Sequence, residues 1–225
     1  MLNRLKCQSL FAFESFYLNN YFSSFEYPWQ IIAHLKDILL SIISDGIDGY
    51  QRQGNGVLVG KDVKISGTAR IEGPTVIGEG CEIRHGAYIR GGVILGRGCV
   101  IGNSSEIKNS LLLDGAQAPH FNYVGDSLLG CKAHLGAGAI CSNLRSDGKN
   151  VAIKCDGERI ETGLRKLGAI LGDNAEIGCG SVLCPGTVIG RNTTVYPLTM
   201  TRGYYPEGSI VKDTYSVIKK GAAPT

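Results

Sequence analysis

The stretch VIGEGCEIRHGAYIRGGVILGRGCVIG, residues 76–102, decides the fold of this chain because an aliphatic residue returns at every sixth position. The same step extends in both directions, through Val59, Ile65, Ile71, Ile77, Ile83, Ile89, Leu95, Ile101, Ile107 and Leu113. It resumes at Leu129 and Leu135, and again from Leu171 to Val195. A period of six fits neither an amphipathic helix nor a single amphipathic strand. It fits a chain that turns a corner after each short strand, with each aliphatic residue pointing inward.

Glycine often follows the aliphatic residue, as at Gly78, Gly96 and Gly102, where a tight corner needs a positive φ or close packing. Three such sides close a triangular coil of about 18 residues per turn, which is the hexapeptide-repeat β-helix. The sequence therefore predicts a mainly β protein built on a parallel β-helix. The spacing alone leaves the hand of the coil open.

A different segment precedes the repeat, over residues 1–50. Pro28 is well placed for a helix start, apolar residues then recur at helical spacing, and Gly46 marks an end. This pattern predicts an amphipathic α-helix over residues 28–45, which we expect to cap the open end of the coil. Residues 8–26 are rich in aromatic side chains. We expect them to pack on that helix or on a neighbouring chain.

The repeat is interrupted twice and fades near its end. The interruptions are residues 114–125 and the polar, basic residues 143–168. Loops that project from a rigid scaffold are where function concentrates. The prediction is therefore an N-terminal segment, a β-helix over residues 51–200, and a C-terminal tail over residues 201–225.

Composition and charge exclude several classes of protein. A net charge of +3 without a basic stripe argues against nucleic-acid binding. The longest apolar stretch, residues 31–43, contains His34, Lys36 and Asp37, which argues against a membrane span. The 8 cysteines form no C-x-x-C pair, so no zinc ribbon or redox motif is expected. With no signal-peptide pattern at the start, these features predict a cytoplasmic location.

Two cations on neighbouring turns suggest an anion site. Residues 18 apart should stack about one strand spacing, roughly 4.8 Å, from each other. If Ile89 and Ile107 point inward, Arg90 and Lys108 point outward on the same side. Two like charges so placed repel unless an anion lies between them, which favours a phosphate site. The alternative is that both long side chains splay into water.

His120, twelve residues after Lys108, is the candidate general base because histidine titrates near neutral pH. The alternative is a loop histidine that backbone hydrogen bonds hold in place. Arg90 and Lys108 on the same stretch of coil strengthen the catalytic interpretation, and both interpretations stay open at this point.

The strings IRGG, VIGNSSEIKNS, PHFNYVGDSLLG and HLGAGAICSNLRSDGK lie between Ile89 and Lys149. They resemble the acetyltransferase half of bifunctional sugar-1-phosphate nucleotidylyltransferase/acetyltransferases, which are glucosamine-1-phosphate N-acetyltransferase-like. The resemblance covers about residues 57–200. It implies a left-handed coil, a homotrimer with its site between neighbouring chains, acetyl-CoA as co-substrate, and an amino-sugar phosphate as acceptor. The nucleotidylyltransferase domain of that family is absent, so no uridylyl transfer is expected.

The resemblance also implies roles for individual residues. His120 takes the position of the general base, with Glu106 in reach to orient the site. Contacts to the amino-sugar phosphate fall at Arg90, Lys108, Glu106, Tyr123, His134, Asn143 and Lys149. The acetyl-CoA groove falls at Ala137, Cys179 and Pro197. His134 replaces an asparagine of the family and Leu144 replaces a tyrosine, so the identity of the sugar stays open.

The predicted chemistry is direct acyl transfer without a metal. A base frees the amine, and a backbone N–H of the LGAGA stretch, residues 135–139, stabilises the oxyanion. Zinc carbonic anhydrases share the scaffold, but His34, His85, His120 and His134 lack the close pair that such a site needs. A non-enzymatic alternative remains, an assembly or regulatory module for a separate sugar nucleotidylyltransferase that uses its aromatic N-terminus as a docking surface.

Overall fold

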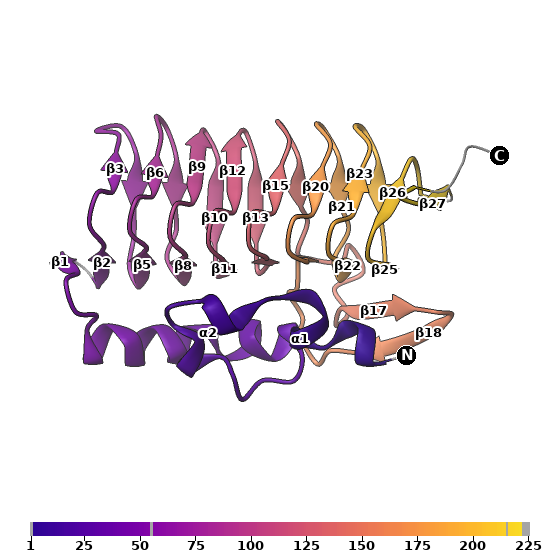
Figure 1. The fold of residues 1–225 in the computed structure, drawn as a ribbon, viewed down its shortest axis with the longest axis horizontal. Helices are drawn as coiled ribbons and strands as arrows, with labels where there is room; N and C mark the ends of the chain where they lie inside the picture. The colour runs from indigo at the N-terminus through magenta and orange to yellow at the C-terminus, as the bar shows by residue number, and fades with distance from the viewer. Residues whose placement is uncertain (1, 55, 215, 222–225) are drawn as a thin grey trace.

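The computed structural model describes residues 2–54, 56–214 and 216–221 and shows a three-sided coil, with one sheet on each side (Figure 1). Sheet A consists of β1 (Gln51–Gln53), β2 (Val57–Val59), β5 (Thr75–Ile77), β8 (Val93–Leu95), β11 (Ser110–Leu112), β14 (Leu128–Leu129), β19 (Ala169–Leu171), β22 (Thr187–Ile189) and β25 (Tyr204–Tyr205). Sheet B consists of β3 (Lys64–Ile65), β6 (Glu82–Ile83), β9 (Val100–Asn103), β12 (Gln117–His120), β15 (His134–Leu135), β20 (Glu176–Ile177), β23 (Thr194–Val195), β26 (Ser209–Val211) and β27 (Val217–Lys219). Sheet C consists of β4 (Arg70–Ile71), β7 (Tyr88–Ile89), β10 (Glu106–Lys108), β13 (Tyr123–Gly125), β16 (Ile140–Cys141), β21 (Val182–Leu183) and β24 (Met200–Thr201).

Successive turns stack in parallel register, which places the aliphatic residues of the repeat above one another. Ile89 of β7 lies opposite Ile107 of β10, and Ile77 of β5 lies opposite Leu95 of β8. These side chains are fully buried inside the coil, where each contributes about 1.5–3 kcal/mol. The predicted fold class, a left-handed parallel β-helix with an N-terminal α-helical segment, is confirmed.

The inward register shifts by one residue after Ile107. Leu112, and not the predicted Leu113, pairs with Leu95 and lies inside the coil, while Leu113 packs outside it. Ala118 and Val124 then continue the core. Residues 114–125 are therefore not an interruption, because β12 and β13 continue two sides of the coil. The six-residue period misses these turns for two reasons. The step from Ile107 to Leu112 is five residues, and the inward residue of the next strand is the small Ala118.

The predicted helix over residues 28–45 is confirmed as α2 (Pro28–Asp45). The side chain of Gln30 accepts a hydrogen bond from the N–H of Tyr27 at 2.9 Å, which stabilises the first turn. Gly46, with φ 75°, ends the helix in a conformation that favours glycine. Shorter helices precede it: η1 (Leu2–Leu5), α1 (Cys7–Leu10), η2 (Phe13–Ser15) and η3 (Asn19–Tyr21).

The helix α2 lies along the outer face of sheet A and does not cap the end of the coil (Figure 1). The expectation of an end cap is wrong because sheet A has a second apolar face that needs cover. Its outward side chains, such as Val76, Ile94 and Leu111, are buried with Leu35 and Leu39 of the helix. We call the helices of residues 2–45 the N-terminal layer.

The aromatic residues of this layer are buried on their own chain. Phe11, Phe13, Phe16 and Phe22 belong to the same apolar cluster as α2 and the outer face of sheet A. The rings of Phe13 and Phe22 stack at 5.9 Å. The first of the two predicted packing partners, the chain's own helix, is therefore the one that the structure shows.

Residues 143–168 leave the coil as predicted, and we call them the excursion. They form a hairpin of β17 (Ala152–Cys155) and β18 (Glu158–Glu161), and a bridge between Leu144 and Lys166 closes its base. Ile153 and Cys155 are buried against sheet A, next to the N-terminal layer (Figure 1). The excursion therefore folds back onto the coil.

The coil extends beyond residue 200, where the sequence predicts the β-helix to end. The strands β25 and β26 pair with β22 and β23, which carries the coil to Val211. The predicted tail over residues 201–225 includes residues 215 and 222–225, which lie outside the described residues. The division into three segments stays a prediction. Across the part of the chain that the structure describes, no helix has the length and hydrophobicity to cross a membrane.

Candidate functional site

His120 lies at the exposed corner where sheet B passes into sheet C. The carbonyl oxygens of three residues at this corner each accept a backbone hydrogen bond of 2.8–3.0 Å from the next turn: His120, Ala137 and Cys179. Pro197 lies one turn beyond Cys179, since the N–H of the following residue donates to the Cys179 carbonyl. All four residues are exposed. The predicted base and the three predicted acetyl-CoA residues thus form one ladder along a single edge.

Asn122 holds this corner in place. Its side chain is buried, with Oδ1 accepting from the N–H of His120 at 3.0 Å. Its Nδ2 donates to the carbonyls of Gly136 at 2.8 Å and Ala139 at 3.2 Å. One amide therefore fixes the backbone of His120 relative to the LGAGA stretch. Sequence reasoning missed Asn122, because a buried amide in a turn does not recur with the six-residue period.

The LGAGA stretch offers one free backbone donor. The N–H groups of Gly136, Gly138 and Ala139 donate to backbone carbonyls at 2.7, 3.0 and 3.1 Å. Among the described residues, the N–H of Ala137 has no acceptor. Because Gly138 is bonded to the carbonyl of His120, this free N–H lies beside the predicted base.

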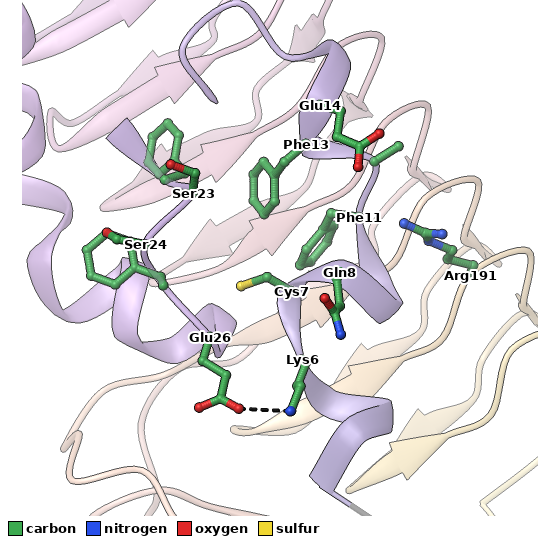
Figure 2. A pocket seen from close by; sticks show the side chains of 13 residues that line it. Lys6, Cys7, Gln8, Phe11, Phe13, Glu14, Ser23, Ser24, Glu26 and Arg191 are labelled. Atoms are coloured by element: carbon green, nitrogen blue, oxygen red, sulfur yellow. Dashed lines mark ion pairs between the residues drawn. The ribbon is translucent and has the colours of Figure 1, made fainter. Parts of the chain in front are cut away.

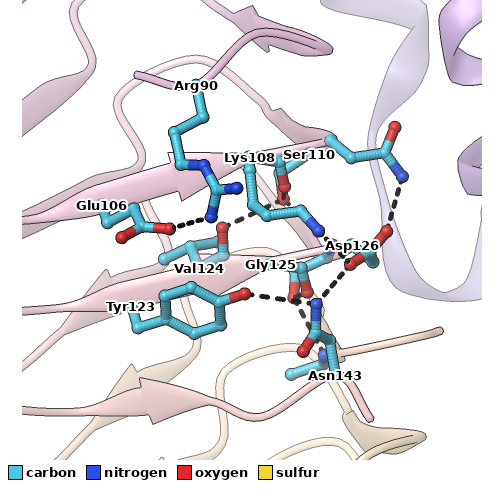
Figure 3. Close-up of polar contacts among 12 residues, drawn as sticks. Arg90, Glu106, Lys108, Ser110, Tyr123, Val124, Gly125, Asp126 and Asn143 are labelled. Carbon is cyan, nitrogen blue, oxygen red and sulfur yellow. Dashed lines mark hydrogen bonds and ion pairs between the residues drawn. The ribbon is translucent and has the colours of Figure 1, made fainter. Parts of the chain in front are cut away.

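Arg90 and Lys108 stack on the outward side of sheet C, as the spacing predicts. The N–H of Arg90 donates to the carbonyl of Ile107 at 2.9 Å, which aligns the two cations on adjacent turns. Each has a carboxylate of its own chain, however (Figure 3). Arg90 Nη1 lies 2.7 Å from Glu106 Oε1, and Lys108 Nζ lies 3.4 Å from Asp126 Oδ2. The hydrogen bond to Glu106 raises the pKa of Arg90, and Glu106 contacts Arg90 where His120 was the expected partner.

Asp126 is the centre of a polar cluster that the sequence interpretation missed. Its buried carboxylate accepts from Asn143 Nδ2 and from Asn109 Nδ2, the latter at 2.8 Å, and pairs with Lys108. Asn143 also lies 3.3 Å from the hydroxyl of Tyr123 (Figure 3). Two predicted substrate contacts, Lys108 and Asn143, therefore meet at one carboxylate, and Tyr123 joins them through Asn143. Asp126 is the last residue of the HFNYVGD string, but no spacing in the sequence marked it as a site residue.

Gly125 allows this cluster to close. A Cβ at position 125 would lie 2.6 Å from the Tyr123 hydroxyl and 2.7 Å from Asn143 Nδ2, both too short. Any larger residue would push these two side chains apart.

Two predicted site residues lie away from the cluster. His134 is on sheet B, where its Nδ1 lies 3.0 Å from Glu176 Oε2. It pairs with Gln117, three residues before His120, which corresponds to roughly 10 Å along the strand. Lys149 is exposed in the excursion, where its N–H donates to Asp147 Oδ1 at 3.2 Å.

Several cavities lie elsewhere among the described residues, and two of them flank the N-terminal layer and the excursion. One of about 570 Å³ lies within the N-terminal layer, between aromatic rings, the Lys6–Glu26 ion pair of 2.9 Å and Arg191 (Figure 2). The predicted site residues do not line it. The other, of about 430 Å³, lies between the excursion and sheet C. Ser142, the neighbour of Asn143, is one of the residues that line it. Within the described ranges, no group of three or more His, Cys, Asp or Glu side chains is placed to hold a metal ion.

Comparisons with known proteins agree with the predicted resemblance. The family described as GMPPB C-terminal domain matches residues 71–162, which include Arg90, Lys108, His120, Tyr123 and Asn143. A bifunctional sugar-1-phosphate nucleotidylyltransferase/acetyltransferase of Sulfurisphaera tokodaii is 40% identical over 88 residues, 39% of this chain and 22% of that protein. The bifunctional protein GlmU of Methanocaldococcus jannaschii is 39% identical over 83 residues, 37% of this chain and 20% of that protein.

Solved structures resemble the fold at low sequence identity. A putative acetyltransferase of Bacillus cereus aligns with a TM-score of 0.46 and 16% identity, over 76% of this chain and 86% of that one. The acetyltransferase domain of PglB from Neisseria gonorrhoeae, in complex with acetyl coenzyme A, aligns with a TM-score of 0.36 and 17% identity, over 77% and 60%.

The chain spans about a fifth of the length of the two curated relatives described above, at 22% and 20%. Within that limit, the resemblance predicted from the sequence is confirmed. Over the central part of its coil, this chain is similar to bifunctional sugar-1-phosphate nucleotidylyltransferase/acetyltransferases.

Proposed function

We propose that this chain is an acetyl-CoA-dependent N-acetyltransferase that acylates the amine of an amino-sugar phosphate. The observation that supports it most is the exposed corner ladder of His120, Ala137, Cys179 and Pro197. The Lys108–Asp126–Asn143 cluster lies across sheet C from this corner, where β10, β13 and β16 end. The proposal assigns the base and the acetyl-CoA contacts to the corner, and the acceptor contacts to sheet C. The similarity to bifunctional nucleotidylyltransferase/acetyltransferases supports the same activity.

The chemistry proceeds by direct transfer. His120 removes a proton from the acceptor's ammonium, because only the free amine is nucleophilic. The amine nitrogen attacks the thioester carbonyl carbon and forms a C–N bond, and the free N–H of Ala137 donates to the developing oxyanion. The carbon–sulfur bond then breaks, the thiolate of coenzyme A leaves, and the proton that the new amide nitrogen loses passes to that thiolate. Acetyl-CoA is a co-substrate in this scheme, and no metal is needed.

The acceptor's phosphate is held on sheet C. Arg90 and Lys108 provide two stacked cations, and Tyr123 and Asn143 provide a hydroxyl and an amide beside them. Glu106 and Asp126 hold these two cations in place, with Glu106 2.7 Å from Arg90 and Asp126 3.4 Å from Lys108. His134 and Lys149 are further contacts only if a neighbouring chain or the acceptor reaches them.

We infer a homotrimer with the site between chains, supported by an apolar row on sheet C. Ile140 pairs with Val182, and Val182 pairs with Met200, so the three side chains line up on the outside of the coil. They are 39%, 37% and 49% exposed. A continuous exposed apolar row of this kind is typical of a surface that another protein covers. The cytoplasmic location stays a prediction.

The alternative, a non-catalytic assembly module, needs an exposed aromatic surface for docking. That interpretation used the aromatic N-terminus as a docking surface, whereas Phe11, Phe13, Phe16 and Phe22 are buried on their own chain.

The test is thiol release from acetyl-CoA with glucosamine-1-phosphate and galactosamine-1-phosphate as paired acceptors. We expect release with at least one of them and a loss of about 10²–10⁴-fold in kcat for His120→Ala. His85→Ala is the matched control, since His85 is exposed at the same corner and bonds Thr68 at 2.8 Å. Normal turnover in His120→Ala removes His120 from the mechanism. If the wild type releases no thiol with either sugar and does not bind coenzyme A, the assembly module is favoured.

A further inference from the structure

The cavity of about 430 Å³ beside the excursion is strongly basic. Four cationic side chains line it: Arg145, Lys154, Arg159 and Arg202. Among the described lining residues, Asp147 is the one carboxylate. A cavity with this charge attracts anions more strongly than an open surface does, because low-dielectric walls concentrate the field.

Two of the four cations have partners and two do not. Arg145 pairs with Asp147 at 2.6 Å, and Arg159 pairs with Glu161 at 2.6 Å. In the part of the chain that the structure describes, Lys154 and Arg202 pair with no carboxylate. The polar contact of the Arg202 guanidinium is the Cys184 sulfur, 3.9 Å away.

The fold itself places the two uncompensated cations next to each other. Gly203, beside Arg202, has φ 85°, and a Cβ there would lie 2.7 Å from the carbonyl oxygen of Lys154. It would also lie 3.2 Å from the Cβ of Lys154, so only a glycine lets β17 of the excursion pack on this turn. Two like charges that line one cavity repel unless an anion joins them.

This cavity is separate from the Arg90–Lys108 pair. Arg202 belongs to the same outward column of sheet C as Lys108, through the small residues Gly125, Ser142 and Cys184. Four strand spacings separate Lys108 from Arg202, or about 19 Å. A phosphate held by Lys108 therefore does not reach Arg202.

We propose that this cavity is a second anion site, which binds a phosphate or diphosphate group through Lys154 and Arg202. The guanidinium of Arg202 bonds two oxygens at once, and the ammonium of Lys154 adds a point charge. The group belongs to a ligand such as a nucleoside diphosphate or coenzyme A, or is free phosphate. The site does not depend on the proposed acetyl transfer.

The test is titration calorimetry of the full chain with inorganic pyrophosphate at fixed ionic strength. An Arg90→Gln/Lys108→Gln background removes the other cation pair. In that background we expect binding to persist, and to weaken by about tenfold or more when Arg202→Gln or Lys154→Gln is added. Lys64→Gln, an exposed lysine on sheet B, is the charge-matched control and should leave binding unchanged.

Three results would overturn the inference. They are loss of pyrophosphate binding in the background alone, binding that survives Arg202→Gln and Lys154→Gln together, and equal weakening by Lys64→Gln. Where the site is supported, uridine diphosphate and coenzyme A identify the ligand. The one whose affinity falls in the Arg202→Gln/Lys154→Gln variant occupies the cavity. If the double variant loses affinity only for pyrophosphate and inorganic phosphate, the site binds the free anion.

Discussion

The carboxylate of Asp126 accepts a hydrogen bond from the side-chain amide of Asn143, one turn further along the coil. The same carboxylate pairs with Lys108 on the preceding turn. Three consecutive turns of sheet C are thereby joined through one buried side chain. The backbone of Asp126 is in the left-handed conformation, with a φ of 48°. Aspartate and asparagine both tolerate this left-handed conformation, so the charge can be removed without changing the backbone.

Asp126→Asn should therefore weaken acceptor binding while the fold stays intact. Loss of the charge frees Lys108 and disturbs Asn143, and we expect KM for the amino-sugar phosphate to rise about tenfold with kcat and KM for acetyl-CoA little changed. Steady-state kinetics with each substrate varied checks this. Asp62→Asn is the matched control, because Asp62 is an exposed aspartate with φ 57°. An unchanged KM for the acceptor would show that Asp126 has only a structural role.

Gly125→Ala should separate the Tyr123 hydroxyl from Asn143. The added Cβ collides with the far ends of these two side chains, which can move, so the melting temperature should change little. Acceptor KM should rise by at least a few fold, and about tenfold if both contacts are lost. Gly67→Ala is the control, since no atom lies within 4 Å of a Cβ built there. A large loss of stability in Gly125→Ala would instead mean that the collision reaches the backbone.

Asn122→Ala should both destabilise the chain and reduce turnover. The change removes a donor from two buried carbonyls: Ala139 loses its Asn122 partner, and Gly136 keeps only the N–H of Ala139 at 3.1 Å, at a cost of about 1–3 kcal/mol. Because His120 loses its backbone anchor, kcat should fall even well below the melting temperature. Asn150→Ala, at an exposed side chain that donates to the carbonyl of Gly163 at 3.3 Å, is the control. Chemical denaturation and kcat measured together decide whether the two effects occur.

Stability should fall at alkaline pH because buried thiols resist ionisation. Burial raises the pKa of Cys7 and Cys141 to about 12 and that of Cys131 to about 11, from 9.0 in the unfolded chain. Between pH 9 and these values the unfolded state releases protons that the folded state retains. The free energy of unfolding therefore decreases as pH rises, by up to about 1.4 kcal/mol per pH unit for each thiol.

Denaturation curves between pH 8 and 10.5 measure this slope, and Cys141→Ala should flatten it. Cys179 is exposed, so Cys179→Ala should leave the slope as it is. A slope that Cys141→Ala does not alter would mean that other groups govern alkaline unfolding.

The parts of the fold that repeat could be predicted from the sequence. Period six identified the coil, helical spacing identified α2 over residues 28–45, and the stacking of Arg90 on Lys108 followed from the turn length. Leu112 took the place of Leu113 because a five-residue step breaks the count. The position of α2 on sheet A could also have been predicted. Val76 and Ile94 are aliphatic and directly precede inward-facing residues, so they point outward and need cover.

The polar core of the site could not be predicted in the same way. Asp126 and Asn122 act through hydrogen bonds to residues about one turn away, and such contacts depend on where side chains end, which a period does not specify. The resemblance supplied His120, Tyr123 and Asn143, and the structure then showed which carboxylate and amide hold them.

The N-terminal layer has a consequence for synthesis of the chain. The N–H of Ala12 donates to the carboxylate of Asp173 at 2.8 Å, across a separation of 161 residues. At about 5–20 residues per second, the aromatic segment leaves the ribosome roughly 10 to 30 s before the turn that fixes it exists. Throughout that interval its phenylalanines have no completed sheet to cover. The segment around Ala12 is therefore secured only after 161 further residues have been made, and until then its apolar side chains stay uncovered.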